Sequence, residues 1–245
     1  MKILAIDSSG MVASAAILQD DVLVGEYSIN HKKTHSQTLL PMIDEVVKMT
    51  ETDLHEIDAI AVAAGPGSFT GLRIGSATAK GLGLALDKPL ISVPTLEGLA
   101  YNAAAFSGLI CPMMDARRKQ VYTGVYRFEG DQFETVIPQK ACPIEEIIED
   151  LNGLGEQVLL LGDGVPVARD MVEEKLTVSH LYAPAHMSRQ RAGAVAVRAA
   201  QLFRQGKTEN ADDHKPIYLR KSQAERELEK QGSNLEELGQ VERTR

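Results

Sequence analysis

A glycine-rich run, GPGSFTGLRIG from Gly65 to Gly75, separates an apolar segment from a long segment with helical spacing. The preceding residues, Ile57 to Ala64, are apolar enough to form a buried strand, so the run is predicted to be a strand-to-helix turn. Glycine at such a turn lets a ligand or another backbone come close, and a helix N-terminus favours anions. The run is therefore a candidate anion cradle or a point of close backbone packing.

Two common nucleotide fingerprints do not fit this run. No Lys-Ser or Lys-Thr pair follows its last glycine, as a P-loop requires, and Thr70 stands where a third glycine of a dinucleotide-binding motif would be. The sequence supports neither of these two sites.

The helix that follows, expected from about Phe69 to Leu86, carries a very small side chain at every fourth position. These residues are Gly71, Gly75, Ala79 and Gly83. Glycine inside a helix costs about 1 kcal/mol relative to alanine, so the pattern needs a compensating close contact. Two interpretations stay open: packing against the chain's own sheet or first helix, and binding of a partner helix.

Composition narrows the class of protein. The 245 residues, 44% of them hydrophobic, are enough for two lobes in one compact body. A formal net charge of -8 argues against a protein that binds nucleic acid without a partner protein, because phosphate binding depends on clustered Lys and Arg. Cys111 and Cys142 are typical of small buried residues in a reducing compartment. With no apolar run near the roughly 20 residues of a membrane span, we expect a cytoplasmic protein without a membrane partner.

The N-terminal part is predicted to order its elements as three strands, helix, strand, helix and strand. The three leading strands, separated by short polar turns, form an antiparallel meander. The expected strands are residues 2–6, 12–18, 22–29, 57–64 and 89–93, and the expected helices are residues 35–50 and 69–86.

The same opening recurs about 108 residues later, counted from Asp7 to Asp115. Each aspartate follows a short apolar strand and precedes a polar turn and a returning alternating strand, which we interpret as a structural duplication. Coincidence is the alternative, because sequence identity between the halves is negligible. Further elements are expected at 144–151, 158–161 and 191–204. The predicted domains are 1–104 and 105–220, with helix 191–204 a candidate for packing on the first lobe, and a charged tail at 221–245.

Several short motifs together carry a resemblance to a known family. They are Ile6 to Ser9, His35 to Pro41, the glycine run, Asp115 to Arg118, and Val121 with Tyr122. Across residues 1–220 the chain resembles the actin, hexokinase and Hsp70 ATPase superfamily, and more closely the TsaB (YeaZ-like) family of subunits that help to make threonylcarbamoyladenosine in tRNA. The resemblance implies a duplicated actin-like (ribonuclease H-like) α/β fold, with two lobes of mixed sheets flanked by helices.

The catalytic relative in this group, TsaD, binds a metal through a His-x-x-x-His pair and a later aspartate. The matching positions here hold Thr95, Leu99 and, by a less certain alignment, Gln190. A hydroxyl, a hydrocarbon and an amide are poor replacements for imidazole and carboxylate ligands, so no metal site is expected. Glu97 is interpreted as a surface or structural residue, and the scattered histidines as solvated or structural.

The resemblance also locates a remnant nucleotide cleft. Its residues would be Asp7, Ser8, Ser9, Gly162 and Gly164. Nucleotide binding there stays open, because the turn at Asp115 to Arg118 replaces a glycine-rich one, and Arg117 and Arg118 would either obstruct phosphates or attract anionic groups. No resident cofactor is expected.

The leading hypothesis is a noncatalytic partner of TsaD that supports threonylcarbamoyl transfer from threonylcarbamoyl-AMP to adenosine 37 of ANN-decoding tRNAs. The resemblance implies a heterodimer with TsaD, binding of the ATPase TsaE to the assembled pair, tRNA contact only through the complex, and a homodimer when TsaD is absent. The expected interface residues are Leu39, Ile43, Val47, Gly71, Gly75, Ala79 and Gly83.

Two enzymatic alternatives are weaker. A metalloprotease lacks its ligands. An ATP-dependent phosphotransferase would use Asp7 as a magnesium-linked base, but a turn residue that caps a hairpin is the favoured interpretation of Asp7.

Overall fold

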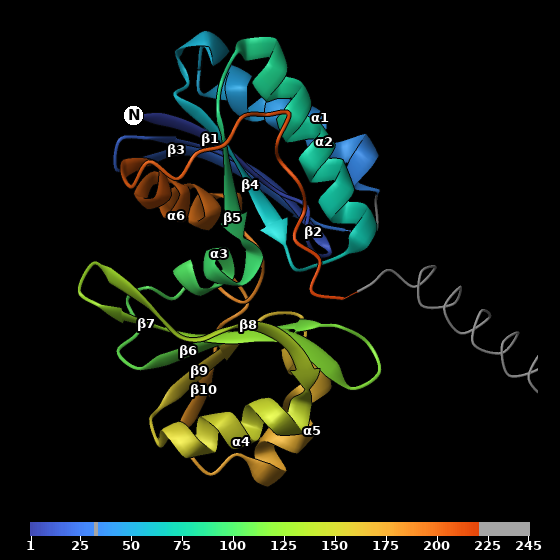
Figure 1. Cartoon of the computed structure of the whole chain (residues 1–245), viewed down its shortest axis with the longest axis vertical. Coiled ribbons are helices and arrows are strands. Elements are labelled where there is room, and N and C mark those ends of the chain that lie inside the picture. The colour runs from blue at the N-terminus through green and yellow to red at the C-terminus, as the bar shows by residue number, and fades with distance from the viewer. Residues whose placement is uncertain (32–33, 221–245) are drawn as a thin grey trace, which may run out of the picture.

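The computed structural model describes residues 1–31 and 34–220, which form two lobes, each built on a five-stranded mixed sheet (Figure 1). The first lobe contains, in chain order, β1 (Lys2–Asp7), β2 (Val12–Gln19), β3 (Val22–Asn30), α1 (His35–Met49), a short 3-10 turn (Leu54–Glu56), β4 (Ala59–Gly65), α2 (Phe69–Leu86), β5 (Leu90–Pro94) and α3 (Thr95–Tyr101).

The second lobe repeats this order of elements. It contains β6 (Leu109–Asp115), β7 (Gln120–Glu129), β8 (Gln132–Pro143), α4 (Ile144–Leu154), β9 (Val158–Leu161), α5 (Val165–Lys175), β10 (His180–Tyr182) and α6 (Ala192–Arg204). The strand order β3-β2-β1-β4-β5 of the first sheet matches β8-β7-β6-β9-β10 of the second, with two antiparallel and two parallel pairings in each. The predicted fold class, a duplicated two-lobed α/β architecture, is confirmed.

The last helix of each half packs against the sheet of the other half. Helix α6 covers one face of the first sheet, where Val195, Ala196 and Ala199 are fully buried, while α1 and α2 cover the opposite face. Helix α3 packs through Leu96 and Leu99 on the second sheet, whose other face carries α4 and α5. The exchanged helices contact each other, and Arg198 of α6 donates to Glu97 of α3 at 2.7 Å. Glu97 therefore has a structural role.

The exchange affects the domain limits. Helices α3 and α6 each cover the sheet of the other lobe, so the two lobes do not coincide with two continuous segments of the chain. The domain limits 1–104 and 105–220 stay a prediction. The predicted tail, 221–245, lies outside the described residues.

Helix 69–86 and strand 158–161 have the bounds that the structure gives them, and most of the other predicted elements begin and end within two residues of theirs. Four elements were not predicted: α3, β8, α5 and β10. Helix α3 is buried on nearly all sides and so lacks an amphipathic period, while β8 and α5 mix polar with apolar residues and contain proline. Their positions follow from the duplication, because each has a counterpart or a sheet to complete.

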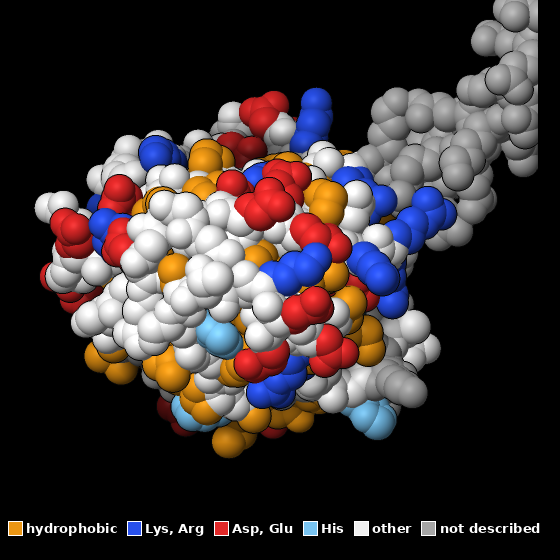
Figure 2. All heavy atoms as spheres, turned by 90° about the horizontal axis from the view of Figure 1, so that it is seen from below, with side chains coloured by type: hydrophobic (Ala, Val, Ile, Leu, Met, Phe, Trp, Pro, Cys, Tyr) orange, Lys and Arg blue, Asp and Glu red, His pale blue; other side chains and the backbone are white. Residues whose placement is uncertain are grey.

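The surface of the second lobe mixes both signs of charge. Seen from that end, Asp and Glu side chains lie interspersed with Lys and Arg (Figure 2). Among the described residues, no helix is long and apolar enough to cross a membrane.

Candidate functional site

A cleft of 590 Å³ lies where the turns of the two lobes face each other. The first lobe contributes the β1–β2 turn, the start of α1 and the β4–α2 turn. The second lobe contributes the β6–β7 turn and Asp163, and the C-terminal segment 217–220 borders the same space. The parallel strands of both sheets therefore direct their connecting turns into one cleft, which is where ligands bind in open α/β sheets.

The β4–α2 turn packs its glycines against the backbone of the β1–β2 turn. A Cβ added to Gly67 would lie 2.3 Å from the carbonyl oxygen of Ser9, and one added to Gly71 would lie 2.1 Å from that of Ser8. The Ser68 amide donates to Ser9 O at 2.7 Å, and Ser68 caps α2 by accepting from the Gly71 amide. Close backbone packing, one of the two interpretations of the run, is thus observed.

The second lobe repeats this arrangement at β9–α5. Gly65 and Gly162, the residues that end β4 and follow β9, both have positive φ, +122° and +110°. A Cβ on Gly162 would lie 2.0 Å from Met113 O, and the Gly164 amide donates to the same oxygen at 2.9 Å. Only glycine tolerates both the conformation and the approach. The duplication therefore extends to the local turns.

The two aspartates that revealed the duplication form equivalent turns. Asp7 Oδ1 accepts from the Ser9 amide at 2.8 Å, and Asp115 Oδ1 accepts from the Arg117 amide at 2.7 Å. An aspartate that accepts from the amide two residues on is an Asx turn, so a turn role explains both residues.

The predicted nucleotide residues are largely used within the chain. Asp7, Ser8 and Ser9 are almost fully buried, with Ser8 Oγ donating to Gly71 O and Ser9 Oγ donating to Asp7 Oδ1. Of the five, only Ser9 lines the cleft, together with Asp163 between the two glycines. Burial raises the pKa of Asp7 to about 6, against the Ser9 hydrogen bonds, which lower it.

The three residues that the resemblance aligned with metal ligands, Thr95, Leu99 and Gln190, are all buried. Thr95, fully buried, accepts the Gly65 amide on its Oγ1 at 3.0 Å, and Leu99 packs among the core residues around α3. Gln190 is 2% exposed, and its amide lies against Gly10 of the β1–β2 turn. Within the described residues there is no group of three His, Cys, Asp or Glu side chains arranged to hold a metal.

Two histidines line the cleft and one anchors the C-terminal segment. His31 and His35 border the cleft, and His35 Nε2 lies 2.8 Å from Gly10 O. His214 is buried, with its Nδ1 at 2.9 Å from Ser92 Oγ and 2.8 Å from a carboxylate oxygen of Glu209. In a catalytic triad the serine and the carboxylate contact different ring nitrogens of the histidine, whereas here both contact Nδ1. This group is therefore a structural anchor.

The small-residue stripe of α2 faces inward, which corrects the expectation that it contacts a partner. Gly71 and Gly75 lie against Ser8, and Gly83 lies against Ala211 and Leu90. Ala79, Leu39 and Ile43 are buried, and Val47 packs on the same core. Helical spacing showed that these side chains share a face, but the sheet and the β1–β2 turn occupy that face.

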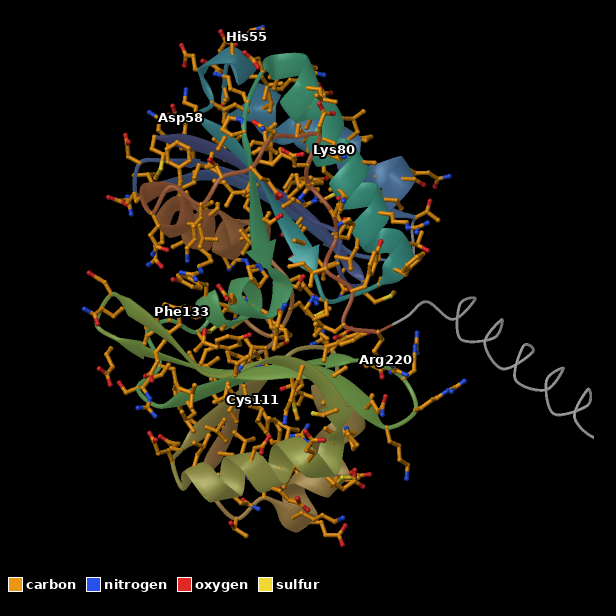
Figure 3. All side chains as sticks on the ribbon, viewed as in Figure 1. His55, Asp58, Lys80, Cys111, Phe133 and Arg220 are labelled. Atoms are coloured by element: carbon orange, nitrogen blue, oxygen red, sulfur yellow. The ribbon has the colours of Figure 1, made fainter. Side chains whose placement is uncertain are left out.

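The chain after α6, residues 205–220, forms a C-terminal strap that reaches the cleft with residues 217–220. It runs along α2 and then between the lobes (Figure 1). The Ile217 amide donates to Ala64 O at 2.7 Å, Lys80 donates to the carbonyls of Asp212 and His214, and Arg220 donates to Ala116 O at 2.6 Å. Lys80 and Arg220 are labelled at these two ends in Figure 3. The strap therefore joins the first lobe to the β6–β7 turn of the second.

Comparison with known proteins gives full-length relatives. The chain is 36% identical over 227 residues to the tRNA threonylcarbamoyladenosine biosynthesis protein TsaB of Bacillus subtilis (strain 168), covering 92% of this chain and 96% of the relative. It is 30% identical to the protein of the same name from Escherichia coli (strain K12), covering 93% and 98%. The chain belongs to the TsaB family.

The family model and a solved structure agree with this membership. Residues 23–228 match the model described as TsaD, tRNA N6-adenosine threonylcarbamoyltransferase. The structure described as YeaZ from Pseudomonas aeruginosa aligns with a TM-score of 0.77 at 25% identity, covering 89% of this chain and 99% of that one. Membership of the TsaB family thus goes together with the two-lobed fold of this solved structure.

Replacing Gly71 with alanine should lower the free energy of unfolding by about 2 kcal/mol, because the new Cβ would overlap Ser8 O. The matched control is Gly81→Ala in the same helix, where a Cβ meets nothing within 4 Å and the change should stabilise by up to about 1 kcal/mol. Urea unfolding of both variants measures the difference. Equal effects would contradict the close packing.

Asp7 should make stability fall as the pH rises. Its pKa is about 6 in the folded chain and 3.8 as the ordinary value, so folding binds a proton between these values and stability is lost as the carboxyl ionises. The stability of Asp7→Asn relative to the parent should therefore grow by about 2.4 kcal/mol between pH 4 and pH 7. Urea unfolding across that range measures it, and a difference independent of pH would place Asp7 in a hydrated environment.

Proposed function

We propose that this chain is a noncatalytic subunit in the formation of threonylcarbamoyladenosine at position 37 of ANN-decoding tRNAs. In this role it dimerises with TsaD, which transfers the threonylcarbamoyl group from threonylcarbamoyl-AMP to N6 of the adenosine. One combined observation carries the proposal. The chain belongs to the TsaB family over nearly its whole length, and at the two histidine positions it has Thr95 and Leu99, whose contacts are buried. These side chains support the fold where a catalytic relative would hold a metal.

The proposed pairing surface is the outer face of α1 and α2, which replaces the inward-facing stripe as the candidate interface. Leu40 on α1 and Leu84 on α2 are 57% and 56% exposed. Between Arg73 and Leu84, the outer face of α2 presents the small residues Ala77 and Gly81, and Gly81 has no atom within 4 Å of an added Cβ. An exposed apolar face with low relief suits close packing by a second helix pair.

The other proposed partners follow from the same pairing. Without TsaD, two copies would pair through it in a two-fold homodimer, because a helix pair can be self-complementary. TsaE, an ATPase, would bind the assembled TsaD pair, and tRNA would be contacted through the complex in the cytoplasm.

The function is tested by depleting the protein and measuring threonylcarbamoyladenosine in total tRNA by nucleoside mass spectrometry. Its level should fall severalfold and return when the gene is restored on a plasmid. An unchanged level after verified depletion would refute the proposed function.

The interface is tested by placing a charge on the outer face of α2. Ala77→Glu should weaken co-purification with TsaD at least tenfold, because a carboxylate would be desolvated in an apolar contact. Ala77 is exposed, so the melting temperature should stay within about 2 °C of the parent. Val167→Glu on α5, at a 50% exposed position, is the matched control. Wild-type pairing by Ala77→Glu would exclude this face.

A further inference from the structure

The β6–β7 turn ends in three consecutive cations held in an unusual backbone conformation. Arg117, Arg118 and Lys119 have φ of +67°, +58° and +57°, the left-handed region that costs non-glycine residues about 1–2 kcal/mol each. All three side chains are exposed. A left-handed turn thus concentrates positive charge at one tip of a chain whose net charge is -8.

The described contacts leave most of this charge unpaired. Arg117 lies 3.4 Å from Asp115, but within residues 1–31 and 34–220 the side chains of Arg118 and Lys119 make no hydrogen bond or ion pair. The tip is anchored through its backbone: the Ile144 amide donates to Lys119 O, and Arg220 donates to Ala116 O. The fold holds the turn in place without using the side chains of Arg118 and Lys119.

An aromatic group stands on the opposite side of the cleft mouth. The Tyr218 and Phe69 rings pack with their centroids 4.8 Å apart, and the Arg73 guanidinium lies over the Phe69 ring at 4.1 Å from its centroid. Arg73 Nε also donates to Tyr218 Oη at 3.3 Å. Tyr218 is nevertheless 40% exposed, so its ring is held in place and still accessible.

The strap brings the tip and the aromatic group together. Tyr218 and Arg220 are two residues apart, a span of at most about 7 Å of chain, and Arg220 contacts the carbonyl next to Arg117. Tyr218, Arg117 and Arg220 line the same cleft. We call Phe69, Arg73, Tyr218, Arg117, Arg118 and Lys119 the cleft-mouth surface.

We propose that the cleft-mouth surface binds single-stranded RNA, with phosphates on Arg118 and Lys119 and a base stacked on Tyr218. Single strands are bound by exposed aromatic rings beside a cationic track, because every base offers a π face and the phosphates follow at regular spacing. The proposal rests on the proposed function, since it assigns to this chain a direct contact with an unpaired loop of the tRNA substrate. The net charge of -8 disfavours an extended contact with phosphates beyond this region.

The first test measures tRNA binding by the complex of this chain with TsaD. The probe is an unmodified ANN-decoding tRNA transcript, and the variant is Arg118→Ala with Lys119→Ala, which keeps the Asp115–Arg117 pair. Affinity at low salt should fall about threefold to tenfold, and the slope of log affinity against log salt should decrease by about 1.4, the value for two single-strand phosphates. The control, Lys175→Ala with Lys207→Ala, removes two exposed cations that lie outside the β6–β7 turn, at the end of α5 and after α6, and should leave the slope unchanged.

The second test separates stacking from strap packing. Tyr218→Phe keeps the ring and loses the hydroxyl that accepts from Arg73, so tRNA affinity should stay within about twofold. Tyr218→Ala should lose about tenfold, as expected for one base–aromatic stack. Equal losses for both variants would overturn stacking.

The outcomes distinguish this proposal from the proposed function. The RNA site alone would be overturned by two results together. The complex that carries Arg118→Ala with Lys119→Ala would bind tRNA with the affinity and salt slope of the parent complex, and the parent complex would form threonylcarbamoyladenosine. Loss of TsaD pairing by that variant would show that the tip contacts protein, which also overturns the RNA site. A parent complex without modification activity would overturn the proposed function itself.

Discussion

The close backbone contact between the β4–α2 turn and the β1–β2 turn is the constraint on which the first lobe and the cleft depend. Gly67 and Gly71 admit the carbonyls of Ser9 and Ser8 at distances that no side chain would allow. This contact fixes where α2 begins, buries Asp7 behind the turn, and leaves the N-terminal residues of α2 bordering the cleft. The second lobe uses Gly162 and Gly164 against Met113 in the same way, so both walls of the cleft have one construction.

The exchange of α3 and α6 makes one body from two similar halves. Each helix buries apolar side chains on the other lobe's sheet, and the Glu97–Arg198 ion pair joins them between the sheets. Phe133 of β8, labelled between the lobes in Figure 3, packs beside Tyr101 of α3 and under the Arg198 guanidinium. Leu99 of α3 is part of the same packing.

The fold was predictable to a useful extent, and the candidate site less so. Asp7 and Asp115 revealed the duplication because the same strand–turn–strand pattern surrounds both, and their Asx turns are equivalent in the structure. The stripe at Gly71, Gly75 and Gly83 correctly indicated close packing, but its partner is the chain's own β1–β2 turn and strap. Helix α3 was missed because uniform burial removes the periodic signal on which a sequence prediction relies.

The sequence by itself determined the local turns, the bounds of α2 and the duplication. These features depend on residue type and short-range spacing. Only the tertiary structure decided which face of α2 is buried, that α3 and α6 exchange sheets, and that the strap brings Tyr218 to the β6–β7 turn. The physical reason is that periodicity specifies which side chains share a face, whereas the surface opposite that face is supplied by segments distant in sequence.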